Sequence, residues 1–112
     1  MVDSWNTGRP VPSERSATFA DGLAVRVAVP LAVEVLREVA TRMVTVSERR
    51  IAEAVGEYVS AGVRAEGAAA AALAAVPDLD DLGDPLVLVV TGRNIDDELF
   101  RQACEHPDSF PD

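Results

Sequence analysis

The sequence predicts an α/β protein in which a parallel sheet is layered between helices, as a three-layer arrangement. The first observation is the run LVLVV at 86–90, five consecutive apolar residues of which three are valine. Such a run suits a strand that is buried on both faces, as central parallel strands are. The second observation is that segments with a strand-like pattern alternate along the chain with segments of helical spacing, which implies parallel pairing. We therefore expect the strand at 86–91 to be the central element of the fold.

The first part of the chain is expected to contain little regular structure. Residues 1–16 include a glycine and two prolines and are predicted to be irregular, with Trp5 covering a neighbouring surface. Ala20-Asp21-Gly22 is typical of a turn, and apolar residues alternate through 23–29 as in a short extended segment.

The middle of the chain predicts two helices and a short strand. Pro30 stands where helices often begin, and apolar residues follow at helical spacing, so we expect a helix at 31–41. Residues 43–46 form a second β-like run. Ser47 has the character of an N-cap and opens a longer helical segment, 47–75, with a break near 62–67.

The second half of that segment is rich in alanine, which favours helix and permits close packing. Glu66 stands at its amino end. The preferred interpretation is a carboxylate that interacts with the field of the helix N-terminus, and a chemical role is the alternative. A polar connection, 77–85, then leads into the strand at 86–91.

Polar residues follow that strand directly. Thr91 and Gly92 form a turn, and Asn94 is expected to cap a helix at 95–104. This places polar groups at the carboxyl edge of a sheet, where open α/β sheets bind ligands. Cys104 is expected to be a buried, unreactive thiol, and His106 falls in a tail, 105–112, that is predicted to be mobile.

Composition limits the classes of function. The chain has 112 residues, an apolar content of 48% and a net charge of −9, which favours one folded domain, 17–104, and argues against nucleic-acid binding. We find no polybasic run and no apolar run of membrane-spanning length, and we expect a cytoplasmic protein that does not bind membranes. All ten basic residues are arginine, so chemistry that needs a lysine amine is not available to this chain alone. Two or three strands make a thin sheet, which suggests the end piece of a larger sheet or a domain that pairs with another copy.

Four motifs carry a resemblance that covers nearly the whole chain: TFADGLAV at 18–25, MVTVSERRIAEAV at 43–55, RAEGAAAAALAAV at 64–76 and LVLVVTGRNID at 86–96. In this order and spacing they resemble the carboxy-terminal part of the fold-type II pyridoxal-phosphate enzymes, which have the tryptophan synthase beta-like fold. Within that family the resemblance is nearest to the threonine and serine dehydratases, a group that includes threonine ammonia-lyase and serine racemase-like enzymes.

The resemblance implies a β-elimination in which a hydroxy amino acid becomes a 2-oxo acid and ammonia, with pyridoxal phosphate as cofactor. It implies that the Thr91 hydroxyl hydrogen-bonds the pyridine nitrogen, a position where family members usually have serine. A neutral hydroxyl does not hold that nitrogen protonated, which makes the ring a weaker electron sink. Gly22 matches the glycine of the family's ADG turn, Glu66 matches a glutamate near the pocket, and Gly92 follows Thr91, whereas Arg93 stands where the family usually has a small residue. These four residues, Thr91, Gly92, Gly22 and Glu66, are the predicted cofactor-binding set, and no catalytic or metal-binding residue is predicted.

The family's Schiff-base lysine, its asparagine loop and its glycine-rich phosphate cradle all lie upstream of the matched region. We therefore expect a fragment, either a truncated gene product or a recombinant piece, that has no dehydratase activity alone and at most feeble affinity for the cofactor. Its expected partner is the missing N-terminal half or a second copy of itself. The alternative is a non-catalytic interaction module, or a module that binds a small anion at Thr91-Gly92 and the helix that opens at Asn94.

Overall fold

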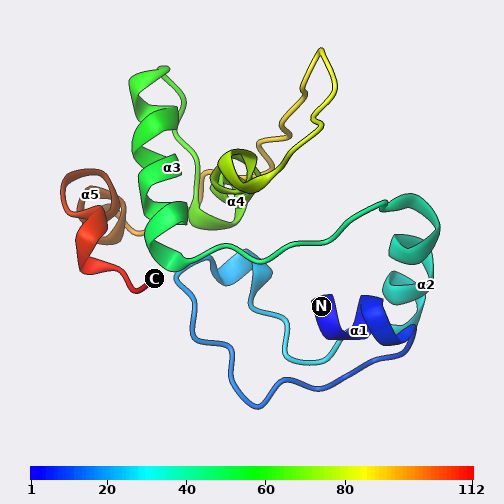
Figure 1. Ribbon diagram of the computed structural model, residues 1–112. Coiled ribbons are helices and arrows are strands. Elements are labelled where there is room, and N and C mark those ends of the chain that lie inside the picture. Colours follow the sequence, from blue (N-terminus) through cyan, green and yellow to red (C-terminus); the bar gives the residue numbers. More distant parts are fainter. The chain divides into compact units, whose positions relative to one another are not determined.

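The structure is a computed structural model that describes residues 1–112. It contains five α-helices and three short 3-10 helices (Figure 1). In chain order these are α1 (Val2–Thr7), η1 (Asp21–Leu23), α2 (Pro30–Val39), α3 (Glu48–Ser60), α4 (Gly67–Ala75), η2 (Val76–Asp78), α5 (Asp97–Glu105) and η3 (Pro107–Ser109). None of the helices is long and apolar enough to cross a membrane.

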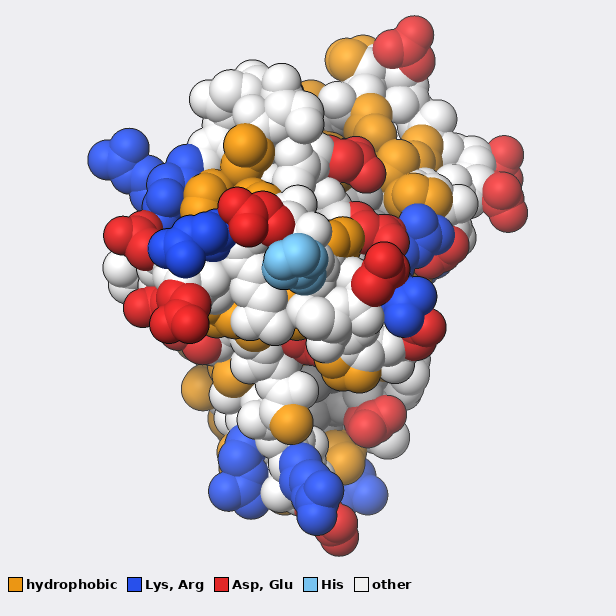
Figure 2. Space-filling view, turned by 90° about the vertical axis from the view of Figure 1, so that its left-hand side faces the viewer, with side chains coloured by type: hydrophobic (Ala, Val, Ile, Leu, Met, Phe, Trp, Pro, Cys, Tyr) orange, Lys and Arg blue, Asp and Glu red, His pale blue; other side chains and the backbone are white.

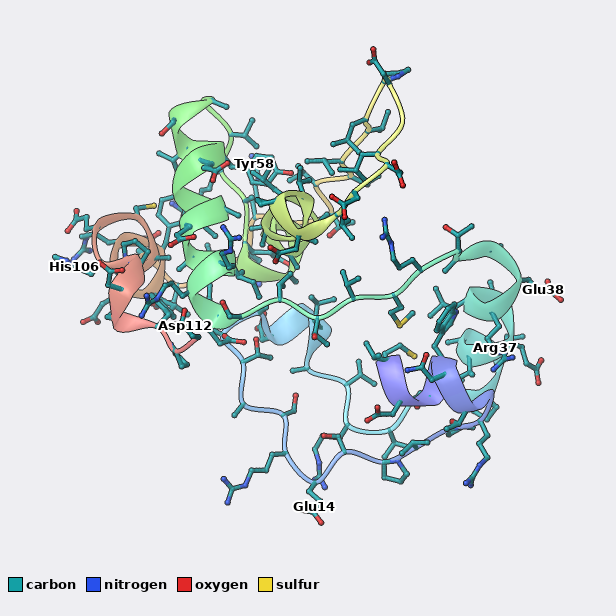
Figure 3. The ribbon with its side chains drawn as sticks, in the orientation of Figure 1. Glu14, Arg37, Glu38, Tyr58, His106 and Asp112 are labelled. Carbon is teal, nitrogen blue, oxygen red and sulfur yellow. The ribbon has the colours of Figure 1, made fainter.

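The chain divides into two compact units, Met1–Thr18 with Leu23–Thr45, and Phe19–Gly22 with Val46–Asp112. In the first unit, α1 packs on α2. The segment 1–16, which is expected to be irregular, therefore contains one short helix. The indole Nε1 of Trp5 donates a hydrogen bond to the carbonyl oxygen of Leu36 at 3.2 Å, and the guanidinium of Arg37, labelled in Figure 3, donates to the carbonyl oxygen of Trp5 at 2.9 Å. Trp5 therefore ties the amino end of the chain to α2.

The second unit is a small helical assembly in which α3 packs on both α4 and α5 (Figure 1). Its core consists mainly of small side chains. The buried residues are Ala20, Ile51, Ala52, Ala54, Val55, Ala70, Ala74, Ala103 and Phe110. Because alanine projects only a methyl group, a core of this kind lets packed helices lie close together.

Helix starts follow local hydrogen bonding. Ser47 is the N-cap of α3, and its hydroxyl accepts a hydrogen bond from the backbone N–H of Arg50 at 3.3 Å, as predicted. The cap of α5 differs from the prediction. Asp96, not Asn94, is its N-cap, and one carboxylate oxygen accepts from the N–H groups of Glu98 and Leu99 at 2.9 and 3.1 Å. The negatively charged carboxylate of Asp96 also lies in the positive field of the helix N-terminus, which stabilises it there more than the neutral amide of Asn94.

The prediction of a three-layer α/β fold with a parallel sheet is wrong, because the structure contains no strand and no sheet. The run 86–91 makes no backbone ladder, and its valines face solvent: Val87 is 74% exposed and Val89 is 68% exposed. The alternating run 23–29 is also without strand structure, and Val29 is 61% exposed. The physical reason is that a strand is stabilised by hydrogen bonds to a neighbouring strand, and this chain provides no neighbour for either run.

The end of the chain packs onto the second unit. In the segment 105–112, for which we expected mobility, η3 is followed by Phe110, which is 8% exposed. Its ring lies 4.7 Å from the ring of Phe19, centroid to centroid, at an interplanar angle of 49°. The backbone N–H of Arg49 donates to the carbonyl oxygen of Pro111 at 3.0 Å. His106 lies just before η3 and is exposed; it is the single pale blue side chain in Figure 2, where acidic groups lie on two sides of it.

Candidate functional site

The best-defined polar cluster of the second unit is centred on Glu66, the residue that precedes α4. Its backbone N–H donates a hydrogen bond to the carbonyl oxygen of Gly92 at 3.1 Å. Its side-chain Oε2 accepts a hydrogen bond from the backbone N–H of Asn94 at 2.8 Å. Glu66 is therefore joined to the turn 92–94 on two sides, once through its backbone and once through its carboxylate.

Two glycines complete the surroundings of this carboxylate. A Cβ atom added to Gly92 would lie 2.6 Å from the carboxylate carbon and oxygens of Glu66, so a side chain at this position requires the carboxylate to move. A Cβ atom added to Gly22 would lie 2.9 Å from the Cβ of Ala68 and 3.4 Å from Oε1 of Glu66. The structure thus brings together three of the four predicted site residues, Gly22, Glu66 and Gly92, from three separate segments of the chain.

Thr91, the fourth predicted residue, lies immediately before this cluster. It is exposed, and its hydroxyl makes no hydrogen bond to the other three residues. Its position depends on the backbone of Gly92, which is fixed by Glu66. The hydroxyl is therefore presented to solvent from the end of the exposed run 86–90.

The turn that carries Gly22 is held by residues outside the predicted site. The backbone N–H of Phe19 donates to a carboxylate oxygen of Glu48, in the first turn of α3, at 2.9 Å. Gly67, the first residue of α4, packs against the same segment: a Cβ there would lie 2.8 Å from the ring of Phe19 and 3.2 Å from the Cα of Ala20. Neither contact has a local sequence signal, although a glycine that opens a helix of alanines indicates close packing.

The chemistry available to this cluster is binding and positioning. A carboxylate and an exposed hydroxyl offer hydrogen-bonding groups, but the chain contains no lysine, and no group of three or more metal-binding side chains lies together. Cys104 on α5 takes no part in the contacts of Glu66. Burial, and secondarily the negative charge of Glu105, raise the pKa of its thiol, while Arg64 acts in the opposite direction.

Comparisons with known proteins point to one family. The family described as "Pyridoxal-phosphate dependent enzyme" matches residues 1–92. The chain is also similar to the L-threonine ammonia-lyase of Thermotoga maritima, with 39% identity over 98 residues. The aligned part covers 86% of this chain but 24% of that relative, so the chain spans about a quarter of the relative's length.

Proposed function

Because this chain belongs to the family of pyridoxal-phosphate dependent enzymes, we propose that it is a fragment of a threonine- or serine-dehydratase-like lyase and supplies one wall of its cofactor site. The observation that carries the proposal is the cluster of Gly22, Glu66 and Gly92 beside Thr91. The resemblance to the family implies that these four residues face the cofactor. When bound, the cofactor supplies the electron sink for β-elimination.

The residues present suit the ring side of such a cofactor. Gly22 is exposed, so a flat ring can approach its backbone from the solvent side. The Thr91 hydroxyl is exposed and available to donate to a ring nitrogen, and as a neutral group it does not hold that nitrogen protonated. These residues orient the ring and take no part in bond breaking.

The chain does not suit the other parts of the cofactor. It has no lysine amine to bond the aldehyde carbon, and no glycine-rich loop to receive the phosphate. We propose that the chain is inactive alone and that these groups come from an upstream portion of a related enzyme. A cytoplasmic location is part of the proposal, since the single cysteine, Cys104, is a free thiol and suits a reducing compartment.

The exposed run 86–90 supports the need for a partner. Val87 and Val89 are more than two-thirds exposed, and residues 86–90 have strand propensity without a strand beside them. A partner chain that covers this run would bury its exposed valines. In the proposed enzyme, the covering surface belongs to the portion that carries the lysine and the phosphate loop.

The test is complementation. The purified chain is mixed with a separately expressed N-terminal portion of a related dehydratase, and cofactor absorbance and 2-oxo acid formation from threonine and serine are followed. We expect activity only in the mixture, and a large loss in Thr91→Ala. Thr45→Ala, which changes an exposed threonine outside the cluster, is the matched control and retains activity. A mixture that binds neither the cofactor nor the added portion contradicts the proposal.

The second candidate function is a non-catalytic interaction module, which the exposed valines of the run 86–90 favour. In that case the purified chain self-associates, ignores the cofactor with or without the added portion, and loses its self-association when the run is made polar. Sedimentation of the chain at several concentrations separates this outcome from the lyase fragment.

A further inference from the structure

We propose that Glu66 is a positioning residue whose carboxylate latches the turn 92–94 to the start of α4 and so fixes the place of the Thr91 hydroxyl. The latch itself is a property of this chain, and its consequence for a reaction rests on the proposed function. It replaces the interpretation that Glu66 only adds negative charge to a helix N-terminus.

The direction of the side chain argues for the latch. Glu66 is the N-cap residue of α4, yet its side chain makes no hydrogen bond to the N–H groups of that helix. Its Oε2 instead accepts from the N–H of Asn94, a residue 28 positions further along the chain, at 2.8 Å. This distance is in the range of charge-assisted hydrogen bonds, which are shorter and stronger than those between neutral groups. A carboxylate that served only the helix field would not need this partner.

Gly92 is the steric counterpart of the latch. Its φ is not in the left-handed region, so alanine could adopt the same backbone conformation. The obstacle to a side chain at 92 is the Glu66 carboxylate, 2.6 Å from the position of the missing Cβ. The glycine at 92 and the glutamate at 66 are thus coupled, because the first leaves the space that the second occupies.

The latch determines the position of Thr91. The carbonyl of Gly92 and the N–H of Asn94 are both bonded to Glu66, so the backbone on the carboxyl side of Thr91 is fixed at two points. On its amino side lies the exposed run 86–90, which has no ladder. Release of the latch therefore leaves the Thr91 hydroxyl without a fixed place.

Three variants of Glu66 distinguish the latch from the helix-field interpretation. Glu66→Gln keeps the length of the side chain and an acceptor oxygen but removes the charge. Glu66→Asp keeps the charge beside the helix but is shorter by one methylene group, so it does not reach Asn94. Glu66→Ala removes the charge and the acceptor oxygen together. Glu57→Ala, which changes an exposed glutamate on α3, is the control.

The measurement is hydrogen exchange of the Asn94 amide, followed by nuclear magnetic resonance in the full chain. We expect exchange to rise about tenfold or more in Glu66→Ala and in Glu66→Asp, and only a few-fold in Glu66→Gln, since loss of a hydrogen bond to a charged group corresponds to that factor. If Glu66→Asp protects the amide as the unchanged chain does, while Glu66→Gln exposes it, the latch is overturned in favour of the helix field.

A double-variant cycle gives an independent readout. Gly92→Ala is expected to lower the urea midpoint of the chain, and the same change in a Glu66→Ala background is expected to have a much smaller effect, because the space is then free. Equal effects in the two backgrounds overturn the steric coupling and with it the latch. If Glu66→Ala does not fold, Glu66→Asp takes its place in the exchange measurement, and the contrast with Glu66→Gln decides.

Failure of the proposed function is distinguishable from failure of the latch. Loss of Asn94 protection in Glu66→Asp supports the latch even if complementation gives no activity, in which case the lyase proposal alone fails. In an active mixture, we expect Glu66→Asp to lower kcat and to alter the absorbance of the bound cofactor with little change in KM. We expect Glu66→Gln to have most of the original kcat and most of the original cofactor absorbance. Unchanged kcat and absorbance in Glu66→Asp overturn the positioning role.

Discussion

Truncation of the Phe110 ring tests whether the carboxyl end of the chain is part of the fold. Phe110 is 8% exposed and packs on Phe19 with a centroid distance of 4.7 Å. Replacement of a buried phenylalanine by alanine costs about 3–5 kcal/mol, of which the aromatic pair contributes about 0.5–1.5 kcal/mol. Since Phe110 lies near the chain end, the last residues can detach without leaving a sealed cavity, and we expect Phe110→Ala to cost about 3 kcal/mol, at the lower end of that range.

The assay is urea unfolding followed by circular dichroism. With a slope of about 1–3 kcal/mol per molar urea, the loss lowers the midpoint by roughly 1–3 M. Phe110→Leu keeps most of the apolar volume and is expected to cost less than about 1.5 kcal/mol. Val87→Ala, at a side chain that is 74% exposed, is the control and should change stability by no more than about 0.5 kcal/mol. If Phe110→Ala shifts the midpoint no more than this control does, the packing argument is refuted and the segment 105–112 is mobile in solution.

Three further predictions concern the cap of α5, the cysteine and the exposed run. Asp96→Ala should destabilise the second unit by about 1 kcal/mol, whereas Asn94→Ala should have an effect below about 0.5 kcal/mol; the reverse order in urea unfolding would return the cap to Asn94. Because burial and then Glu105 raise the pKa of the Cys104 thiol, its alkylation by iodoacetamide at pH 8 should be slower in the native chain than in urea, and Glu105→Gln should accelerate the native reaction by lowering that pKa; a native rate above the unfolded one contradicts this. Val87→Asp and Val89→Asp should weaken any self-association seen by sedimentation without lowering the urea midpoint, and unchanged association would place the contact elsewhere.

The parts of the fold that the sequence predicts well are those that depend on neighbouring residues. Ser47 was recognised as the N-cap of α3 because its hydroxyl reaches an N–H only three residues away. The break near 62–67 was recognised from glycines, and the structure places it between Ser60 and Gly67, with Gly62 at a φ of 76°. Asn94 and Asp96 are two residues apart and both have capping side chains, so local preference alone did not decide between them.

The prediction of strands is wrong for a nonlocal reason. A run such as LVLVV at 86–90 reports that its side chains suit a sheet, but not that another strand is within reach. The spacing of residues along the chain also does not predict which of them meet at the site. Glu66 and Asn94 are 28 residues apart, and Gly22 comes from another segment, so their proximity was implied only by the resemblance to the family. Whether these residues hold the cofactor stays a prediction.

The contact between α3 and α4 also limits how this chain can change. Ala70 is fully buried, Ala69 is 2% exposed and Ala74 is 4% exposed, so these three buried positions of α4 carry the smallest side chain that has a Cβ. Truncation to glycine removes only a methyl group there, and every larger side chain adds volume to a buried position, at a typical cost of about 1–3 kcal/mol. Adaptation of this unit is therefore directed away from α4, toward the exposed runs and the helix ends, where side chains vary without moving a backbone.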